Sequence, residues 1–191
     1  VYEEKKMEEM EVCFLMDRFG YMKLIDKNAY ERNKEPVHNE NKYVFNCMNT
    51  DKICIFTDTG KMHTIKAVDI PLGRFRDKGT PVDNLSNYDS SQERMLYVAP
   101  VGQLRSDRLL FVTKTSMCKL VEGAEFDVAK RTIASTKLAD EDELILYWQC
   151  FRDGADCAPE PWRLLPAIPD TRSFDNEENC TWCAGHETGR R

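Results

Sequence analysis

A hairpin motif occurs three times in this chain, and this repetition constrains the fold more than any other feature of the sequence. The copies are Leu15–Tyr30, Phe56–Ile70 and Val112–Phe126, and each has an apolar start, a polar turn and a second strand. Gly20 and Gly60 occupy equivalent turn positions, where glycine suits the positive φ of a tight hairpin. A hairpin unit that recurs at roughly 40–55 residues predicts a propeller-like array, in which each unit depends on its neighbours for burial.

Equivalent positions in the three copies also share a polar character. Lys23, His63 and Lys119 each follow the turn position by three residues, and Ser116 takes the place of the turn glycine in the third copy. Apart from these hairpins the apolar segments are short, rich in β-branched or aromatic residues, and separated by turn formers, which is typical of an all-β protein. We therefore expect strands over residues 11–15, 21–25, 43–47, 94–99, 108–113, 117–121 and 144–147. Residues 27–41 are polar and contain a proline, so we expect a loop there.

The middle copy runs into a short loop that is rich in positive charge. Gly73 and Gly79 bracket Arg74, Arg76 and Lys78, and prolines flank the loop on both sides. Three cations on a glycine-bounded loop are suited to contact a phosphate backbone. The alternative is an ordinary solvated turn, because runs of charge are usually only exposed surface.

Composition narrows the classes of function. The net charge is −6, which argues against a generally basic nucleic-acid binder and requires local patches for any contact with DNA. The sequence has no apolar run long enough to span a membrane and no signal-peptide pattern, so we expect a cytoplasmic protein without membrane contact. Because the chain begins at Val1, we expect a fragment of something longer. Four cysteines lie in apolar strand patterns and are expected to be buried free thiols: Cys13, Cys47, Cys54 and Cys118.

These repeats resemble the C-terminal domain of the A subunit of bacterial type IIA topoisomerases, DNA gyrase and topoisomerase IV. The family pattern T-x-x-G, a cation, I-P, further cations and K-G-x-P-(I/V)-x-N-L is matched here by Thr57, Gly60, Lys66, Ile70, Pro71, Arg76, Lys78, Gly79, Pro81, Val82, Asn84 and Leu85. Weaker copies at residues 17–23 and 138–144 extend the resemblance over about residues 10–147. The fold that this implies is a β-pinwheel fragment of about three blades over residues 11–149, in which blades exchange strands, after a lead-in over residues 1–10.

In that family the outer rim carries double-stranded DNA bent around the disc, so the resemblance implies a DNA-wrapping accessory domain. Wrapping costs elastic energy, which many phosphate contacts must offset without base readout. The candidate DNA-binding cations are Arg74, Arg76, Lys78, Lys61, Lys66, Arg18, Lys23, Lys119, Lys130 and Arg131, with His63 and Lys114 as further rim candidates. The alternative for each is a solvated charge at a strand end. A β-propeller that binds proteins and not DNA is the competing function.

The resemblance also implies what the chain lacks. The family cleaves DNA with a nucleophilic tyrosine, an adjacent arginine and acidic metal ligands, and no tyrosine here has that context. We therefore expect a non-catalytic fragment of an ATP-dependent type II topoisomerase, without cofactor or metal, that meets the ATPase B subunit through the remainder of the A subunit. The glutamine-led basic box of gyrase is absent, and its nearest equivalent has Arg76-Asp77 in place of a double glycine. This departure favours a topoisomerase IV-like or divergent subunit and leaves the enzyme type open.

The tail over residues 150–191 has a different character, with clustered proline, cysteine and tryptophan and no alternation. One hypothesis is a metal site formed by Cys180, Cys183 and His186 with Cys150 or Cys157. Another is a shifted reading frame. The codons for Asn176–Thr188, read one base later, permit M-K-K-T-A-L-G-V-R-G-M-K-L, and those for Trp162–Ile168 permit G-G-Y-F-L-R-F. Such a segment would be the remnant of a further blade, and its present residues would carry no function.

Overall fold

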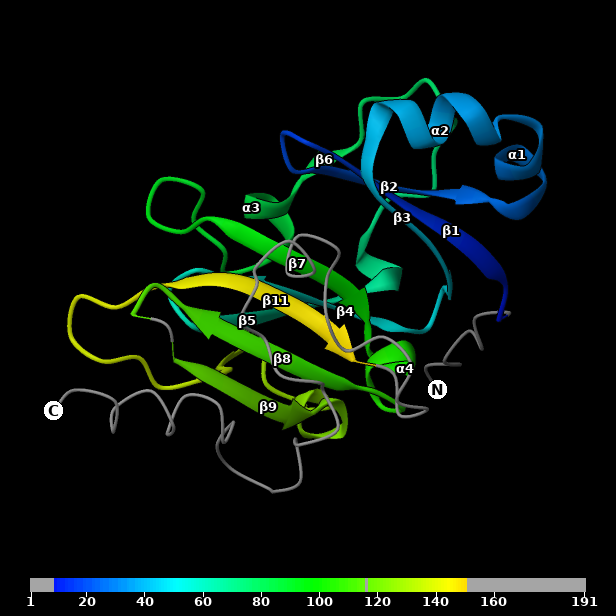
Figure 1. Ribbon diagram of the computed structural model, residues 1–191. Helices are drawn as coiled ribbons and strands as arrows, with labels where there is room; N and C mark the ends of the chain where they lie inside the picture. The colour runs from blue at the N-terminus through cyan, green and yellow to red at the C-terminus, as the bar shows by residue number, and fades with distance from the viewer. Residues whose placement is uncertain (1–8, 116, 151–191) are drawn as a thin grey trace, which may run out of the picture. The chain divides into compact units, whose positions relative to one another are not determined.

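The computed structural model of this protein describes residues 9–115 and 117–150, and Figure 1 shows its strands and short helices. The chain divides into two compact units, one formed by residues up to 53 together with 65–88, and the other by residues 54–64 and the chain from 89 onward. The predicted tail, residues 150–191, lies outside the described residues except for its first. The domain boundaries drawn from the sequence therefore stay a prediction.

The first unit contains a four-stranded sheet in the order β3-β1-β2-β6. Its strands are β1 (Glu11–Asp17), β2 (Tyr21–Asp26), β3 (Asn41–Met48) and β6 (Thr80–Pro81). β1 and β2 are the first predicted hairpin, and Gly20 has the expected positive φ of 82° in its turn. Short helices complete the unit: α1 (Lys27–Arg32), α2 (Lys34–Glu40), η1 (Ala67–Asp69) and α3 (Val82–Leu85).

The second unit contains most of one sheet, in the order β10-β5-β4-β7, and the whole of another, in the order β11-β8-β9. Their strands are β4 (Lys52–Thr57), β5 (Lys61–Lys66), β7 (Met95–Pro100), β8 (Arg108–Thr113), β9 (Cys118–Glu122), β10 (Thr132–Ala134) and β11 (Leu144–Cys150). The helices of this unit are α4 (Val101–Leu104) and η2 (Gly123–Phe126). All the predicted strands are present, with ends that differ by a few residues.

Both four-stranded sheets are completed by a strand from the next repeat. β6 follows the second hairpin in sequence but pairs with β2 of the first, with Thr80 opposite Met22. β10 follows the third hairpin but pairs with β5 of the second, with Ile133 opposite Met62. This exchange of strands, in a mostly β-sheet chain, confirms the all-β, pinwheel-like fold class.

The prediction of a loop over residues 27–41 is wrong, because the chain forms α1 and α2 there. The Asp26 carboxylate caps α1 by accepting a hydrogen bond from the backbone N–H of Asn28 at 2.7 Å. Pro36 lies in the first turn of α2, where its missing N–H removes no helical hydrogen bond. Val37 is fully buried against a cluster on the sheet that includes Cys13 and Leu15. One buried valine was too little apolar periodicity to indicate a helix from sequence.

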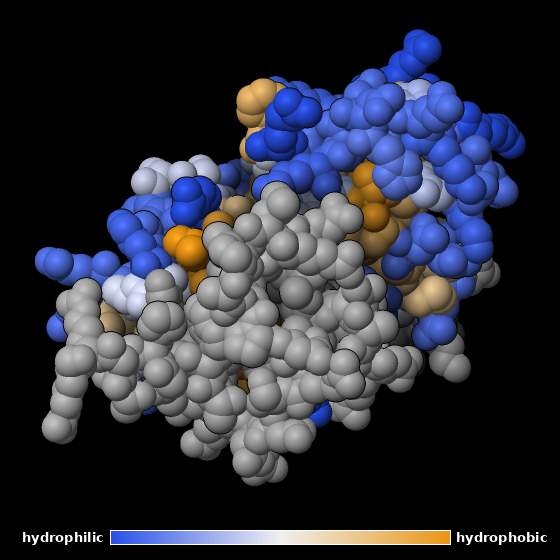
Figure 2. Space-filling view, viewed as in Figure 1, coloured by the Kyte–Doolittle hydropathy of each residue, from blue (hydrophilic) through white to orange (hydrophobic). Residues whose placement is uncertain are grey.

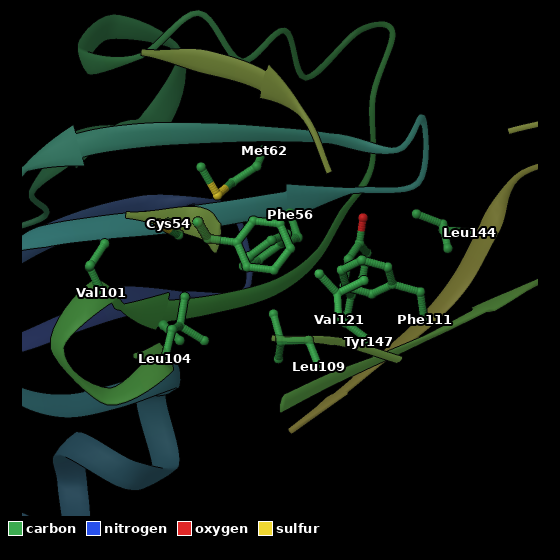
Figure 3. Close-up of a cluster of buried hydrophobic side chains, with 12 residues drawn as sticks. Cys54, Phe56, Met62, Val101, Leu104, Leu109, Phe111, Val121, Leu144 and Tyr147 are labelled. Atoms are coloured by element: carbon green, nitrogen blue, oxygen red, sulfur yellow. The ribbon is translucent and has the colours of Figure 1, made fainter. Parts of the chain in front are cut away.

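The core of the second unit is an aromatic cluster assembled from several strands. Phe56 on β4 lies among the side chains of Phe111, Phe126 and Tyr147, with ring centroids 5.0 Å apart for Phe56 and Tyr147. Figure 3 shows Phe56, Phe111 and Tyr147 converging on the same region. The Tyr147 hydroxyl donates to the backbone carbonyl of Thr57 at 3.1 Å, so this ring also joins β11 to β4 by a polar contact. Burial raises the pKa of Tyr147 well above its usual range.

Cys13, Cys47, Cys54 and Cys118 form no disulfide within the described part of the chain. Cys13, Cys47 and Cys54 are buried, as the sequence predicted, but Cys118 is only partly buried. Burial raises the pKa of Cys13 to about 11 and that of Cys47 to about 12, so both remain protonated thiols at neutral pH. Among the described strands β9 lies at the end of its sheet, which leaves Cys118 less covered than the other three cysteines.

Candidate nucleic-acid interface

The basic loop over residues 73–79 belongs to the first unit and is closed by its own aspartate. The Asp77 carboxylate accepts a hydrogen bond from the backbone N–H of Arg74 at 2.7 Å, and the Asp77 N–H donates to the Arg74 carbonyl at 3.0 Å. The side chains of Arg74, Arg76 and Lys78 are exposed. In the part of the chain that the structure describes, neither guanidinium group forms an ion pair. The loop therefore presents two unneutralised arginines to solvent.

Lys23 holds this loop from beneath. Its ammonium nitrogen lies 2.5 Å from the backbone carbonyl oxygens of both Phe75 and Asp77, and 5.5 Å from the centroid of the Phe75 ring. Only 9% of Lys23 is exposed. Burial lowers the pKa of Lys23, an effect opposed by the nearby carboxylates of Asp77, Glu40 and Asp17. The sequence placed Lys23 among the cations that contact DNA, whereas the structure places its ammonium on the backbone of the basic loop.

A glycine allows the loop to approach β2 closely. Gly79 has a φ of 84°, and a Cβ atom there would lie 2.5 Å from the carbonyl oxygen of Met22. Next to it, the Lys78 ammonium lies 4.3 Å from the centroid of the Tyr21 ring, which is within the range of a cation–π contact. The cations of the second repeat are therefore held on the hairpin of the first.

Arg18 and Lys66 are the remaining candidate cations of the first unit, and both are exposed. Arg18 lies in the β1–β2 turn beside Phe19, whose side chain is 80% exposed. Sequence reasoning did not select Phe19, although an aromatic residue in a polar hairpin turn is itself a signal of a surface contact. Arg18 and Phe19 therefore place an exposed cation and an exposed aromatic ring at adjacent positions of this turn.

In the second unit two candidates are occupied by internal contacts. The Lys61 ammonium lies 2.6 Å from one carboxylate oxygen of Glu93, and Nε2 of the buried His63 lies 2.9 Å from the other. His63 Nδ1 lies 3.1 Å from the hydroxyl of Thr132 on β10. Burial alone would raise the pKa of Glu93, but hydrogen bonds from Lys61 and His63 outweigh it and leave the pKa below its usual value. The charge of Lys61 is thus balanced by a local carboxylate.

Three other candidates of the second unit, Lys119, Lys130 and Arg131, are exposed. The Arg131 carbonyl accepts a hydrogen bond from the Thr64 N–H at 2.8 Å, so the backbone of this basic segment is fixed against β5. Lys114 instead pairs with Glu143 at 3.0 Å. The exchange of strands therefore brings basic residues to the outer hairpin strand of the preceding repeat in both units.

Hydrophilic surface in this molecule does not by itself indicate a positive patch. Figure 2 shows mostly hydrophilic residues over α1 and α2. Lys27 there pairs with Glu11 at 2.6 Å, and Lys34 pairs with Glu31 at 2.7 Å. By contrast, the exposed Arg74 and Arg76 of the basic loop form no ion pair with any described residue.

The described residues contain no group of three potential metal ligands, and the Cys180, Cys183 and His186 hypothesis lies outside them. None of the helices in the described part of the chain has the length and apolar character that crossing a membrane requires.

Replacing Lys23 by methionine should loosen the basic loop without unfolding the sheet. The change leaves two carbonyl groups without their charged donor, which typically costs about 1–3 kcal/mol. We expect amide hydrogen exchange at Asp77 to accelerate about tenfold or more, since that N–H closes the loop. Lys27→Met, on an exposed lysine of α1, is the matched control and should leave Asp77 unaffected. Equal exchange at Asp77 in both variants would show that Lys23 does not hold the loop.

In sequence, the chain is similar to part of the DNA gyrase A subunits of several bacteria. The DNA gyrase A subunit of Streptococcus pneumoniae is 28% identical over 156 residues, which is 75% of this chain and 19% of that protein. The DNA gyrase A subunit of Campylobacter fetus is 26% identical over 137 residues, 66% of this chain and 16% of that protein. The chain thus spans about a fifth of the length of these curated relatives. No protein-family model matches it.

Solved structures agree with the sequence comparison in fold. The C-terminal domain of DNA topoisomerase IV superposes with a TM-score of 0.66 at 18% identity, covering 78% of this chain and 47% of that one. The E. coli ParC C-terminal domain gives a TM-score of 0.55 at 10% identity, covering 73% of this chain and 56% of that one. By sequence and by fold, the resemblance of this chain to the C-terminal domains of type IIA topoisomerase A subunits is confirmed.

Proposed function

We propose that this chain is a DNA-binding and DNA-wrapping module of a type IIA topoisomerase A subunit, one that contributes phosphate contacts and no strand cleavage. The observation that carries the proposal is the basic loop, because Lys23 and Asp77 order its backbone while Arg74 and Arg76 remain exposed and unpaired. An ordered loop backbone lowers the conformational entropy that is lost when the loop binds phosphates. Contacts of this kind position a duplex without reading its sequence.

The other exposed cations extend the proposed contact: Arg18, Lys66 and Lys78 in the first unit, and Lys119, Lys130 and Arg131 in the second. Lys61 contributes less because Glu93 balances its charge, and Lys23 acts by holding the loop. In the intact enzyme the B subunit would be reached through the rest of the A subunit, in the cytoplasm. DNA would have to bend to reach cations on successive repeats, and the summed phosphate contacts would offset that cost.

The test is the salt dependence of binding to a duplex of about 40 base pairs, measured by fluorescence anisotropy. The observed slope of log K against log salt should be about −0.9 per phosphate contact. Replacing Arg74, Arg76 and Lys78 together by alanine should weaken binding at least tenfold at 0.1 M salt and make the slope shallower by up to about 2.7. The loss should be the same for unrelated DNA sequences.

The matched control removes three lysines that are already paired with carboxylates, Lys27, Lys34 and Lys114. Both triple variants lose three positive charges, so a difference between them isolates the place of the charge from its amount. Equal losses in the two variants would remove the basic loop from the proposal. A chain with no salt-dependent affinity for DNA would favour the alternative, a propeller that binds proteins.

A further inference from the structure

The tip of the first hairpin carries the most exposed large apolar side chain among the described residues. Phe19 is 80% exposed, and the next, Leu72, is 57% exposed. Figure 2 shows apolar colour projecting beside strongly hydrophilic residues at this end of the β1–β2 hairpin. A single exposed apolar residue is ordinary on a protein surface, so the surroundings of Phe19 decide whether its ring has a ligand.

The backbone of this turn is held from two sides. One oxygen of the Asp17 carboxylate accepts hydrogen bonds from the N–H groups of Phe19, at 2.8 Å, and Tyr21, at 2.9 Å. The Gly20 carbonyl accepts a hydrogen bond from the Val82 N–H at 3.0 Å, which ties the turn to the segment that follows β6. The Phe19 ring therefore stands on an ordered support, which lowers the entropy lost when it binds a ligand.

Two cations belong to the same hairpin tip. Arg18 precedes Phe19, is exposed, and forms no ion pair with any described residue. The Lys78 ammonium lies 4.3 Å from the centroid of the Tyr21 ring, two residues after Phe19. The tip thus combines an aromatic ring with positive charge. Duplex DNA is a partner that offers both an anionic backbone and flat apolar surfaces, those of its stacked bases.

The aromatic residue is particular to the first of the three hairpins. Thr59 and Thr115 take the place of Phe19 in the second and third hairpins, one residue before the turn position. Their hydroxyl groups lie within hydrogen-bond distance of the threonine two residues earlier, at 2.9 Å from that of Thr57 and 3.1 Å from that of Thr113. These two turns therefore use that position for contacts within the turn, whereas the first turn presents an exposed ring there.

The charge next to this position differs between the hairpins in the same way. Asp58 takes the place of Arg18 in the second hairpin, and its carboxylate accepts a hydrogen bond from the Arg94 N–H at 2.9 Å. Lys114 takes that place in the third hairpin, and its ammonium pairs with Glu143 at 3.0 Å. Of the three hairpins, the first is the one that presents an unpaired cation together with an aromatic ring.

We propose that Phe19 is a wedge that inserts between two base pairs of the bound duplex from the minor groove, while Arg18 contacts the flanking phosphates. The inference rests on the proposed DNA wrapping and adds to it the point at which the duplex is kinked. Proteins that bend DNA often unstack one base step with an apolar side chain. Because the other two hairpins carry threonine at this position, the kink is confined to the first repeat, and the rest of the bend is smooth.

The probe is a duplex of about 40 base pairs with one central mismatch beside a 2-aminopurine, a base whose fluorescence rises when it is unstacked. The fully paired duplex is the reference, and the protein is the full 191-residue chain. A mismatch lowers the cost of unstacking, so we expect binding to be about fivefold tighter than to the paired duplex, with about a twofold rise in fluorescence. Phe19→Ala should abolish both the preference and the rise. It should leave the slope of log K against log salt unchanged, because no charge is lost.

Leu72→Ala is the matched control, because it removes another exposed apolar side chain from the same unit and should keep both effects. Salt-dependent binding without the mismatch preference or the fluorescence rise would overturn the wedge and leave the proposed DNA binding standing. A preference and a rise that persist in Phe19→Ala would also overturn it, and would leave the ring for a protein partner. Absence of any salt-dependent affinity for either duplex would end both proposals.

Discussion

Gly123→Ala should destabilise the second unit by about 3 kcal/mol or more. A Cβ atom at Gly123 would lie 1.8 Å from the carbonyl oxygen of Leu104 and 2.8 Å from that of Asp107. Both neighbours are backbone atoms, so no side chain can rotate away, and the turn between α4 and β8 must move. The same movement would break the hydrogen bond from the Gly123 N–H to the Asp107 carbonyl, 2.8 Å long. Overpacking alone typically costs about 1–3 kcal/mol, and the lost hydrogen bond adds to it.

The matched control is Gly102→Ala, the same chemical change in the same unit. Nothing lies within 4 Å of a Cβ atom at Gly102, which is in α4. Alanine is favoured over glycine in a helix, so this variant should be unchanged or more stable by up to about 1 kcal/mol. Urea unfolding followed by circular dichroism compares the two midpoints. A midpoint for Gly123→Ala that equals that of Gly102→Ala would mean that η2 does not pack against α4 as the structure has it.

The strands of this fold were predictable because the repeated hairpin carries its own signals. Gly20 and Gly60 mark two of the turns, and alternating or continuous apolar runs mark the strands that meet at them. The helices over residues 27–40 were missed because their charged residues and Pro36 obscure a pattern that depends on one buried valine, Val37. The residues there have little intrinsic preference for a helix, and packing of Val37 against the sheet favours the helix instead.

The candidate interface shows the limit of sequence reasoning more sharply. The exposed cations of the basic loop could be named from composition, but Lys23 lies 52 residues from Phe75, whose carbonyl it contacts. The spacing of Lys23 from the turn glycine showed that this position repeats along the chain. It could not show which atoms the Lys23 ammonium contacts. His63 occupies the equivalent position in the next repeat, and its side chain also makes internal contacts, with Thr132 and Glu93. Pairing across exchanged strands sets these roles, and it is not encoded in either segment alone.

Phe56→Ala should cost about 3–5 kcal/mol, the usual range for deleting a buried aromatic side chain. Phe56 is fully buried, and its ring lies 5.1 Å from that of Phe126 in an edge-to-face arrangement and 5.0 Å from that of Tyr147. These partners come from η2 and β11, whereas Phe56 is on β4, so the ring joins the two sheets of the second unit (Figure 3). Aromatic pairs contribute about 0.5–1.5 kcal/mol each beyond the apolar area they bury.

Because the Phe56 ring links two sheets, its removal should lower the local stability of β8 and β11 together with that of β4. Hydrogen exchange under mild urea, read at amides of all three strands, would show whether their stabilities fall together. Phe19→Ala is the matched control, since Phe19 is 80% exposed and its loss should change stability by no more than about 0.5 kcal/mol. If exchange accelerates on β4 alone, the two sheets unfold separately, and the aromatic cluster is not what makes adjacent blades one cooperative unit.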